Sequence, residues 1–321
     1  MDRTNTTAFI EAQQYSQFIL ENLPDIVLPD GFTRDVSDFG TGTTLNIKTV
    51  GSTTIQDVAE NIPLSFTNID TNSITMSITD YIGDAWQVSD ELRQDGSQID
   101  TLLAMRAMEA TRAIAENVET KYLAKCNSIQ TANAANNVNN IKHRFVANGA
   151  GKQITLQDFA YMAYAFDKAN VPDGGRIAIV DPVVELTINT LTNLVNVSNN
   201  PRFEGMITDG FAKDHRFVRN IFGWDIYTSN RLATLSAAEG ALTDYEGNVT
   251  AGAVGDVANI FMSVLDDNTK PIMRAWRLMP QTEGWRDPEG RADKFQVTCR
   301  FGFGGQRSDT LGILITSPTA F

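Results

Sequence analysis

The stretch that decides the fold is Ser97–Asn127, which reads SQIDTLLAMRAMEATRAIAENVETKYLAKCN and contains neither glycine nor proline. Ser97, with Asp100 three residues later, is similar to a helix capping box, in which the serine side chain accepts from a backbone N–H of the first turn. The stretch predicts one helix over 97–127, roughly 45 Å long at about 1.5 Å per residue. A helix of that length favours a mechanical role over a catalytic one. Its apolar side chains recur at helical spacing, at Ile99, Leu102, Leu103, Ala107, Ala110, Ile114, Val118 and Tyr122.

The composition is that of a folded protein. Its 321 residues are 42% hydrophobic, enough for about two domains with their own cores. The opening MDRTNTTAFIEAQQ lacks the apolar run of a signal peptide, and no stretch reaches the ~20 apolar residues of a membrane helix. Cys126 and Cys299 are expected to be buried, reduced thiols, since two cysteines make no disulfide framework. We therefore expect a soluble protein made in a cytoplasm.

Charge is distributed unevenly along the chain. The net charge is −13, of which residues 1–100 carry −12, whereas residues 270–307 carry +4. An acidic first third disfavours nucleic-acid binding, because phosphate contacts need clusters of Lys and Arg. Two interpretations remain open. The acidic residues form a solvated face, or the acidic part of one copy meets the basic part of another, since opposite charges steer association.

The region before the long helix is predicted to contain an arm and a β-hairpin. Residues 1–38 indicate an extended arm with one short helix over 8–20. Alternating polar and apolar residues predict strands at Thr44–Lys48 and Ser73–Thr79, separated by a polar, acidic tip at 51–70. An isolated hairpin is marginally stable in water, so this one must lie on its own subunit or on a neighbour.

The region after the long helix mixes helices and strands. An amphipathic pattern predicts a helix over Leu156–Lys168, and Asp181-Pro182 predicts the start of another. Together they indicate a compact α+β or α/β unit followed by closing strands. The predicted strands are 176–180, a strand–turn–strand unit over 217–231, then 260–265, 272–279, 295–303 and 310–316.

No motif for catalysis or cofactor binding emerges. His143 and His215 lack the spacing of a zinc motif, and no G-x-S-x-G elbow occurs. Gly149–Lys152 lacks the first glycine and the final Ser or Thr of a phosphate loop. Phe301–Gly305 leads into a strand, which offers no helix N-terminus to a pyrophosphate. We predict no catalytic, cofactor-binding or metal-binding residue. The remaining carboxylates are scattered, as in Asp90/Glu91, Asp266/Asp267 and the predicted turn Asp287–Gly290.

Four segments occur in a particular order: VSDEL at 88–92 before the long helix, RIAIVDP at 176–182, FGWDIYTSN at 222–230, and the strands of 295–316. This ordered set, over nearly the whole chain, resembles the major capsid proteins of tailed phages. The resemblance implies the α+β fold of the Hong Kong 97 type (HK97-like), which encapsulin shells share. It implies an N-terminal arm over 1–38 and an extended loop over 39–84. It also implies a peripheral domain of 85–155 plus 281–321 with spine helix 97–127, and an axial domain of 156–280.

The hypothesis that follows is a major capsid protein whose hexamers and pentamers build an icosahedral shell around phage double-stranded DNA, without specific DNA binding. Two alternatives stay open, an encapsulin-like compartment shell and an unrecognised hydrolase. The family's scaffolding segment does not precede the arm here, so a separate scaffolding protein or prior removal of the segment is expected. A portal and a cement protein are further possible partners. Some relatives crosslink a lysine of the extended loop, where Lys48 is the only lysine. Candidate contacts between subunits are Lys48, Asp57, Glu60, Asp70, Arg286, Arg291 and Lys294.

Overall fold

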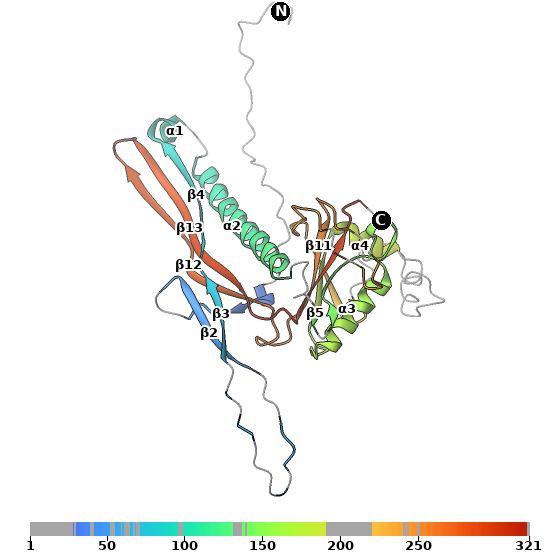
Figure 1. Cartoon of the computed structure of the whole chain (residues 1–321). Coiled ribbons are helices and arrows are strands. Elements are labelled where there is room, and N and C mark those ends of the chain that lie inside the picture. The colour runs from blue at the N-terminus through green and yellow to red at the C-terminus, as the bar shows by residue number, and fades with distance from the viewer. Residues whose placement is uncertain are drawn as a thin grey trace, which may run out of the picture.

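The computed structural model describes residues 28–319 apart from gaps at 29, 39–41, 52–54, 59, 61–64, 67, 69–70, 96–98, 131–136, 139, 191–219, 240–241, 243 and 249–250. The expected arm helix, the Ser97 cap, Asp70 and His215 lie outside the described residues. Two sheets, one long helix and a projecting hairpin make up the rest (Figure 1).

The first sheet has four strands in the order β1-β12-β13-β4, with β1 parallel to β12 and the other pairs antiparallel. Inward and outward side chains alternate along β4. Ile82, Trp86 and Val88 face one side, where Trp86 stacks on Phe295 of β13 with ring centroids 6.0 Å apart. The strands are β1 (Arg34–Asp35), β4 (Asp80–Ser89), β12 (Ile272–Asp287) and β13 (Ala292–Gly305).

The predicted long helix is confirmed as α2 (Ile99–Ile129), which follows the short helix α1 (Asp90–Asp95). It lies along the inner face of the four-stranded sheet, and its C-terminal end reaches the second sheet (Figure 1). Tyr122, Leu123 and Cys126 are buried there in one core cluster that contains residues of both sheets. The helix is therefore the element that joins the two halves of the molecule.

The second sheet has six strands in the order β7-β14-β11-β8-β10-β9. Its central strands β11 and β8 are buried along their whole length, which explains their continuous apolar runs. Helices α3 and α4 cover one face, and α2 closes part of the other. The elements are β7 (Arg144–Val146), α3 (Leu156–Lys168), β8 (Arg176–Val180), α4 (Pro182–Thr190), β9 (Asn220–Ile221), β10 (Trp224–Thr228), β11 (Val257–Ser263) and β14 (Leu311–Thr316).

Helix starts in this unit follow their sequence signals. Thr155 and Asp158 form a reciprocal capping box at α3, and the backbone N–H of Val183 donates to Asp181 at the start of α4. Short elements complete the described chain: η2 (Asp30–Phe32), η4 (Ala150–Lys152), and the strand pair β5 (Asn137–Val138) and β6 (Ile141–Lys142).

The hairpin of β2 (Thr44–Val50) and β3 (Thr71–Ser77) confirms the two predicted strands. Its base crosses the outer face of the four-stranded sheet, where Met76 and Ile78 pack against Met273 and Ala275. Beyond that crossing the hairpin projects away from both sheets (Figure 1). The expectation that the hairpin cannot bury itself thus applies to its distal part, while its base is seated on its own subunit.

Each sheet draws strands from more than one of the predicted domain ranges, and the domain boundaries themselves stay a prediction. The closing strand β14 and strand β7 were expected in the peripheral domain, yet both belong to the six-stranded sheet. Strand β12 begins at Ile272, inside the expected axial domain, and belongs to the four-stranded sheet, as does β4 from Asp80, inside the expected extended loop. Sheet membership is a matter of long-range pairing, which the order of segments along the sequence does not specify.

Candidate assembly surfaces

The distal hairpin carries apolar side chains that nothing in the described chain covers. Ile55, Val58 and Phe66 are 94%, 76% and 101% exposed. The tip has an ordered cross-link nonetheless, because Gln56 bridges its two sides. The Gln56 amide donates to the carbonyl of Ser65 at 2.9 Å and accepts from the Ser65 N–H at 3.1 Å. The Gln56 side chain thus takes the place of one hydrogen-bonded backbone pair. It links the two sides of the loop that carries the exposed apolar residues.

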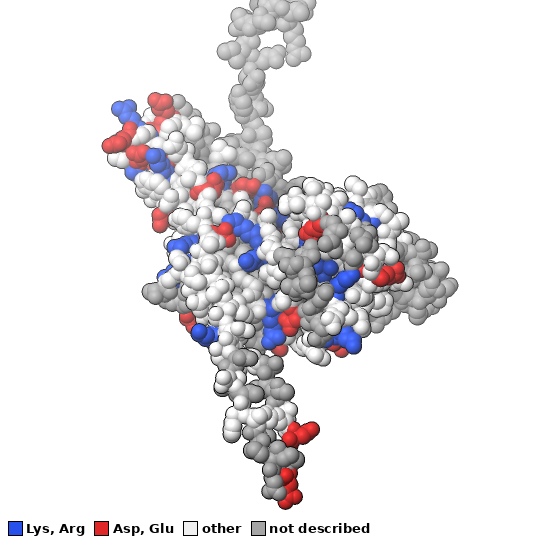
Figure 2. All heavy atoms as spheres, in the orientation of Figure 1, with Lys and Arg blue, Asp and Glu red and all other residues white. Residues whose placement is uncertain are grey.

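The same hairpin is acidic at its end. Asp57 and Glu60 are exposed, and Figure 2 shows only acidic side chains among the coloured residues at the hairpin end. Lys48 lies farther back on β2 and is exposed as well. These three predicted contact residues therefore point to solvent in the single chain and are accessible to a neighbour.

The opposite end of the molecule is densely charged but internally paired (Figure 2). Arg286 on β12 makes a bidentate pair with Asp90 at 2.6 Å and lies 3.3 Å from Asp293. This pairing holds the pKa of the Asp90 carboxyl below its ordinary value, the Arg286 hydrogen bond being the largest cause. Lys294 pairs with Asp287 of the adjacent turn.

Three of the predicted contact residues lie in this charged end, and two of them already have partners in their own chain. Arg286 and Lys294 are paired as described, and Arg291 is exposed and accepts the Asp90 N–H through its backbone carbonyl at 3.0 Å. Here acidic residues from the first hundred positions and basic residues from 270–307 meet within one chain, and the suggested contact between copies stays a prediction. The predicted turn at Asp287–Gly290 is confirmed, since Asp287 accepts from the N–H groups of Glu289 and Gly290.

Two further pairs attach α2 to β4. Arg106 contacts Asp84 at 2.6 Å and stacks over Trp86, while Lys121 contacts Asp80 and lies over Phe301. In each case a cation is shared between a carboxylate and an aromatic face. Because Asp80 and Asp84 point toward the helix, the inward face of β4 contains acids, and the strand could not be recognised from apolar alternation.

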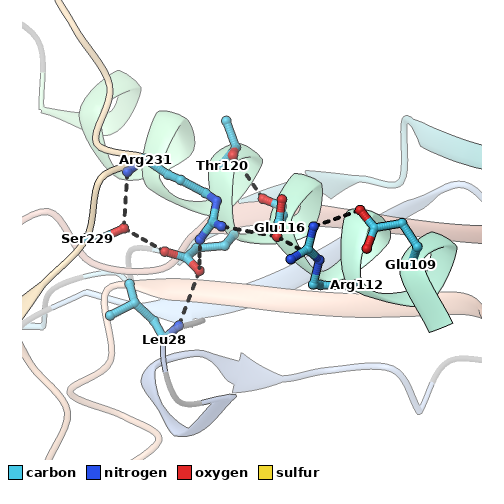
Figure 3. A network of polar contacts seen from close by, with 8 residues as sticks. Leu28, Glu109, Arg112, Glu116, Thr120, Ser229 and Arg231 are labelled. Carbon is cyan, nitrogen blue, oxygen red and sulfur yellow. Dashed lines mark hydrogen bonds and ion pairs between the residues drawn. The ribbon is translucent and has the colours of Figure 1, made fainter. Parts of the chain in front are cut away.

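A buried carboxylate connects three segments of the chain at the middle of α2 (Figure 3). Glu119 has a side chain only 3% exposed. It accepts from Ser229 Oγ at 2.6 Å, from Arg231 Nη1 at 3.2 Å and from the backbone N–H of Leu28 at 3.2 Å. The N-terminal segment, the long helix and the turn after β10 therefore share one anchor. Sequence reasoning missed Glu119, whose only signal was an acid near the apolar face of the predicted helix.

The network continues along a partly buried side of α2. Arg231 also reaches Glu116 at 3.4 Å, and Arg112 lies between Glu116 at 3.5 Å and Glu109 at 2.7 Å (Figure 3). Burial costs an unpaired carboxylate several kcal/mol, and the Arg231 partner and the two hydrogen bonds offset that cost at Glu119.

Beside this anchor lies a cavity of about 200 Å³ between α2, the N-terminal segment and β12. Thr111 lies at its edge and is exposed, whereas the interior is aromatic and aliphatic. Arg274 and Glu119 are the charged residues in its wall. Other wall residues include Phe32, Ile114, Val118, Tyr122, Trp276 and Phe303.

Side chains of types that often take part in catalysis or phosphate binding are paired or buried in this fold. Lys152 of the incomplete phosphate-loop motif pairs with Asp256, and burial raises the pKa of the Cys126 thiol to about 12. His143 is buried against Phe166, and burial lowers its pKa. Among the residues that the structure describes, no cluster of His, Cys, Asp and Glu could hold a metal ion. Across the same residues, no helix is long and apolar enough to cross a bilayer.

Known proteins identify this arrangement. The family model described as phage capsid protein matches residues 71–316, which contain β3, β4, α2 and both sheets. The chain belongs to the phage capsid protein family. No curated protein matches the sequence.

Several solved phage structures have the same fold as this capsid protein. A chain of the mature capsid of bacteriophage PhiM1 is 13% identical, with a TM-score of 0.72 over 97% of this chain and 93% of that one. A capsid chain of cyanophage Pam1 is 13% identical, with a TM-score of 0.67 and 100% of both chains covered. A chain from Mycobacterium phage Che8 is 14% identical, with a TM-score of 0.66 over 95% of this chain and 97% of that one. At such identities the likeness concerns the fold, and the predicted Hong Kong 97-type α+β fold is confirmed.

Family membership gives the capsid protein a structural role in a phage shell, a place in the virion capsid and association with copies of itself. The compartment-shell and hydrolase alternatives are not favoured by these matches.

Proposed function

We propose that the capsid protein assembles into hexamers and pentamers of an icosahedral shell that encloses double-stranded phage DNA. The observation that carries this proposal is the braced hairpin tip, whose apolar side chains are exposed in the single chain. Burial of apolar surface stabilises by roughly 25 cal/mol per Å², so a second copy that covers the tip supplies the free energy of association.

The domain assignments belong to the same proposal. The four-stranded sheet with α2 serves as the peripheral domain, and the six-stranded sheet with α3 and α4 serves as the axial domain. Residues 1–38 act as an arm and the hairpin as the extended loop. The α2 ion pairs to β4 and the Glu119 anchor support a rigid subunit in which the distance between the two domains is fixed.

The contacts between copies follow from exposure. Lys48, Asp57 and Glu60 are accessible, and we assign them, with Asp70, to the surface that a neighbour covers. Arg286, Arg291 and Lys294 take part as members of the paired cluster at the far end of the sheet, where a rigid and nearly neutral surface meets the next subunit.

Other components complete the proposed shell. A separate scaffolding protein, a portal and a cement protein are the expected partners, and the chain is made in the host cytoplasm. The net charge of −13 suits a wall that contains DNA without gripping it, since DNA repels a negative surface.

Electron microscopy and gel filtration of the expressed protein test the proposal. We expect closed particles or megadalton capsomers, and nuclease-protected DNA in particles taken from infected cells. A matched variant replaces residues 51–70 with a two-residue Asn-Gly turn, and we expect it to fold with an unchanged circular dichroism spectrum but to elute as a small species. A wild-type protein that stays monomeric or dimeric at every salt and protein concentration would refute self-assembly, and particles filled with protein instead of DNA would refute the cargo.

A further inference from the structure

The hairpin tip presents an exposed aromatic side chain beside a hydrogen-bonded link. Phe66 is wholly exposed and lies next to Ser65, which the Gln56 side chain holds in place. A braced loop loses little conformational entropy on binding, so apolar burial there is converted efficiently into affinity. Ile55 neighbours Gln56 on the other side of the bridge and widens the apolar surface.

The cavity beside α2 has the size and lining to receive such a side chain. Its volume is about 200 Å³, larger than the 150 Å³ or so of an engineered cavity that binds benzene. Four aromatic side chains contribute to its wall: Phe32, Tyr122, Trp276 and Phe303. Aromatic rings pack favourably edge to face with a further ring, which favours Phe66 over an aliphatic side chain as the occupant.

Charge distinguishes this cavity from a second hollow in the described surface. A groove of about 430 Å³ between α3 and the β9–β10 turn is bordered by Asp167, Asp173 and Arg176, which pairs with both acids. With two acids and one cation, that groove suits the acids of the hairpin tip, Asp57 and Glu60, less well than the α2 cavity does. The α2 cavity instead has Arg274 in its wall, and its one carboxylate, that of Glu119, is compensated by Arg231.

The two surfaces cannot meet within one chain as it stands, because the hairpin projects away from α2 (Figure 1). We propose that Phe66 of one copy inserts into the cavity between α2 and β12 of a second copy, with Asp57 and Glu60 on the side of Arg274. This inference rests on the proposed self-assembly and specifies the residues through which one contact is made.

Photocrosslinking tests the contact while keeping an aromatic ring at the tip. Phe66 is replaced with a phenylalanine that carries a diazirine on its ring, shells are assembled and irradiated, and the captured peptide is identified by mass spectrometry. We expect intermolecular products within 111–122 or 274–280. The matched control places the same amino acid at Tyr81, an exposed aromatic residue on the outer face of the four-stranded sheet, and should not label those segments.

A pair of cavity variants gives an independent measurement. Ala115→Phe fills the cavity from its own wall, whereas Ala113→Phe adds the same ring to the exposed side of α2. With folding verified by circular dichroism, Ala115→Phe and Phe66→Ala should each raise the protein concentration needed for shell formation about tenfold or more, and Ala113→Phe should not.

The outcomes separate this inference from the proposed function. Shells that form normally while the Phe66 probe labels 160–176, 222–223 or no second copy would overturn the inference and leave self-assembly intact. Equal effects of Ala115→Phe and Ala113→Phe would overturn it too. Failure of the wild-type chain to form shells would overturn the proposed function itself.

Discussion

Strand β13 lies between α2 on one face and the hairpin base on the other. The residues that contact these two elements alternate along Phe301, Gly302, Phe303 and Gly304. The two phenylalanines lie toward α2, where Phe303 is 5.8 Å from Tyr122 between ring centroids. The two glycines lie toward the hairpin base. A Cβ added at Gly302 would come within 2.6 Å of the Ser77 carbonyl and 2.8 Å of Ile78 Cα. This Phe-Gly sequence does not have the context of a dinucleotide-binding motif. Its glycines instead allow the hairpin base to pack closely against β13.

Gly302→Ala should lower the free energy of unfolding by about 1–3 kcal/mol, because the clash is with backbone atoms that cannot rotate away. Gly31→Ala is the matched control, since a Cβ there meets nothing within 4 Å. Chemical denaturation of both variants measures the difference. A Gly302→Ala protein as stable as Gly31→Ala would contradict the close approach of the two strands.

Asp158 makes stability depend on pH. Its buried carboxyl accepts from the N–H and the hydroxyl of Thr155, both at 2.8 Å, and from the Asn148 N–H at 3.2 Å. Burial raises its pKa from 3.8 to about 6, against the lowering effect of these hydrogen bonds. Between those values the folded chain keeps a proton that the unfolded chain has lost, so this group's contribution to stability falls as pH rises.

The variant Asp158→Asn does not titrate and isolates this effect. The stability of the wild type relative to the variant should increase by about 3 kcal/mol as pH is lowered from roughly 7 to roughly 3.5. Denaturant unfolding at a series of pH values measures that difference. A difference that does not change with pH would show that Asp158 has an ordinary pKa in the folded chain.

Among the elements, α2 gains its rigidity from partners on two sides. Its apolar face meets the core of both sheets, and its polar contacts reach β4, the N-terminal segment and the turn after β10. Contacts at many points along its 31 residues therefore oppose bending of the helix.

Glu119→Gln tests the central anchor of α2. The new amide places an N–H group where Ser229, Arg231 and Leu28 all donate hydrogen bonds. It also leaves Arg231 with Glu116 as its carboxylate in this cluster. We therefore expect the unfolding free energy to fall by about 2–4 kcal/mol. Glu109→Gln is the control on the same helix, because Glu109 is 31% exposed and pairs with Arg112. It should change stability by less than about 0.5 kcal/mol.

Hydrogen exchange gives a second measurement of the same anchor. The Leu28 amide donates to Glu119, so it should exchange faster in Glu119→Gln and at the wild-type rate in Glu109→Gln. Equal protection in both variants would mean that the N-terminal segment does not depend on this carboxylate.

At the scale of the whole molecule, the charge asymmetry is partly neutralised by folding. Asp80, Asp84 and Asp90 of the acidic third pair with Lys121, Arg106 and Arg286. At the hairpin tip, Asp57 and Glu60 stay exposed (Figure 2). Electrostatic steering between copies is therefore expected to act at the tip more than along the sheet.

A charge swap at the other end distinguishes contacts within a chain from contacts between chains. Lys294→Glu places a carboxylate beside Asp287 and should reduce shell yield by disturbing the turn. Adding Asp287→Lys recreates the pair in reverse and should restore the yield to near the wild-type level, measured by gel filtration. A double variant that assembles as poorly as Lys294→Glu would show that Lys294 acts on a neighbour.

Local patterns by themselves determined the helices over 99–129 and 156–168, the strand 176–180 and the hairpin strands, because each has an apolar period and a terminal signal that do not depend on distant residues. The ordered segments also pointed to the capsid fold. Strand β4 and the second half of β12 were not recognised, since β4 turns acids toward α2 and β12 continues through exposed residues.

Only the tertiary structure decided which strands share a sheet. It placed β14 beside β11 and β7 beside β14, in a sheet that does not contain β13. It also brought Glu119, Leu28, Ser229 and Arg231 together from positions about 90 and 110 residues apart. The physical reason is the same in each case. Strand pairing and buried charge pairs are contacts of high sequence separation, and no local period encodes the partner.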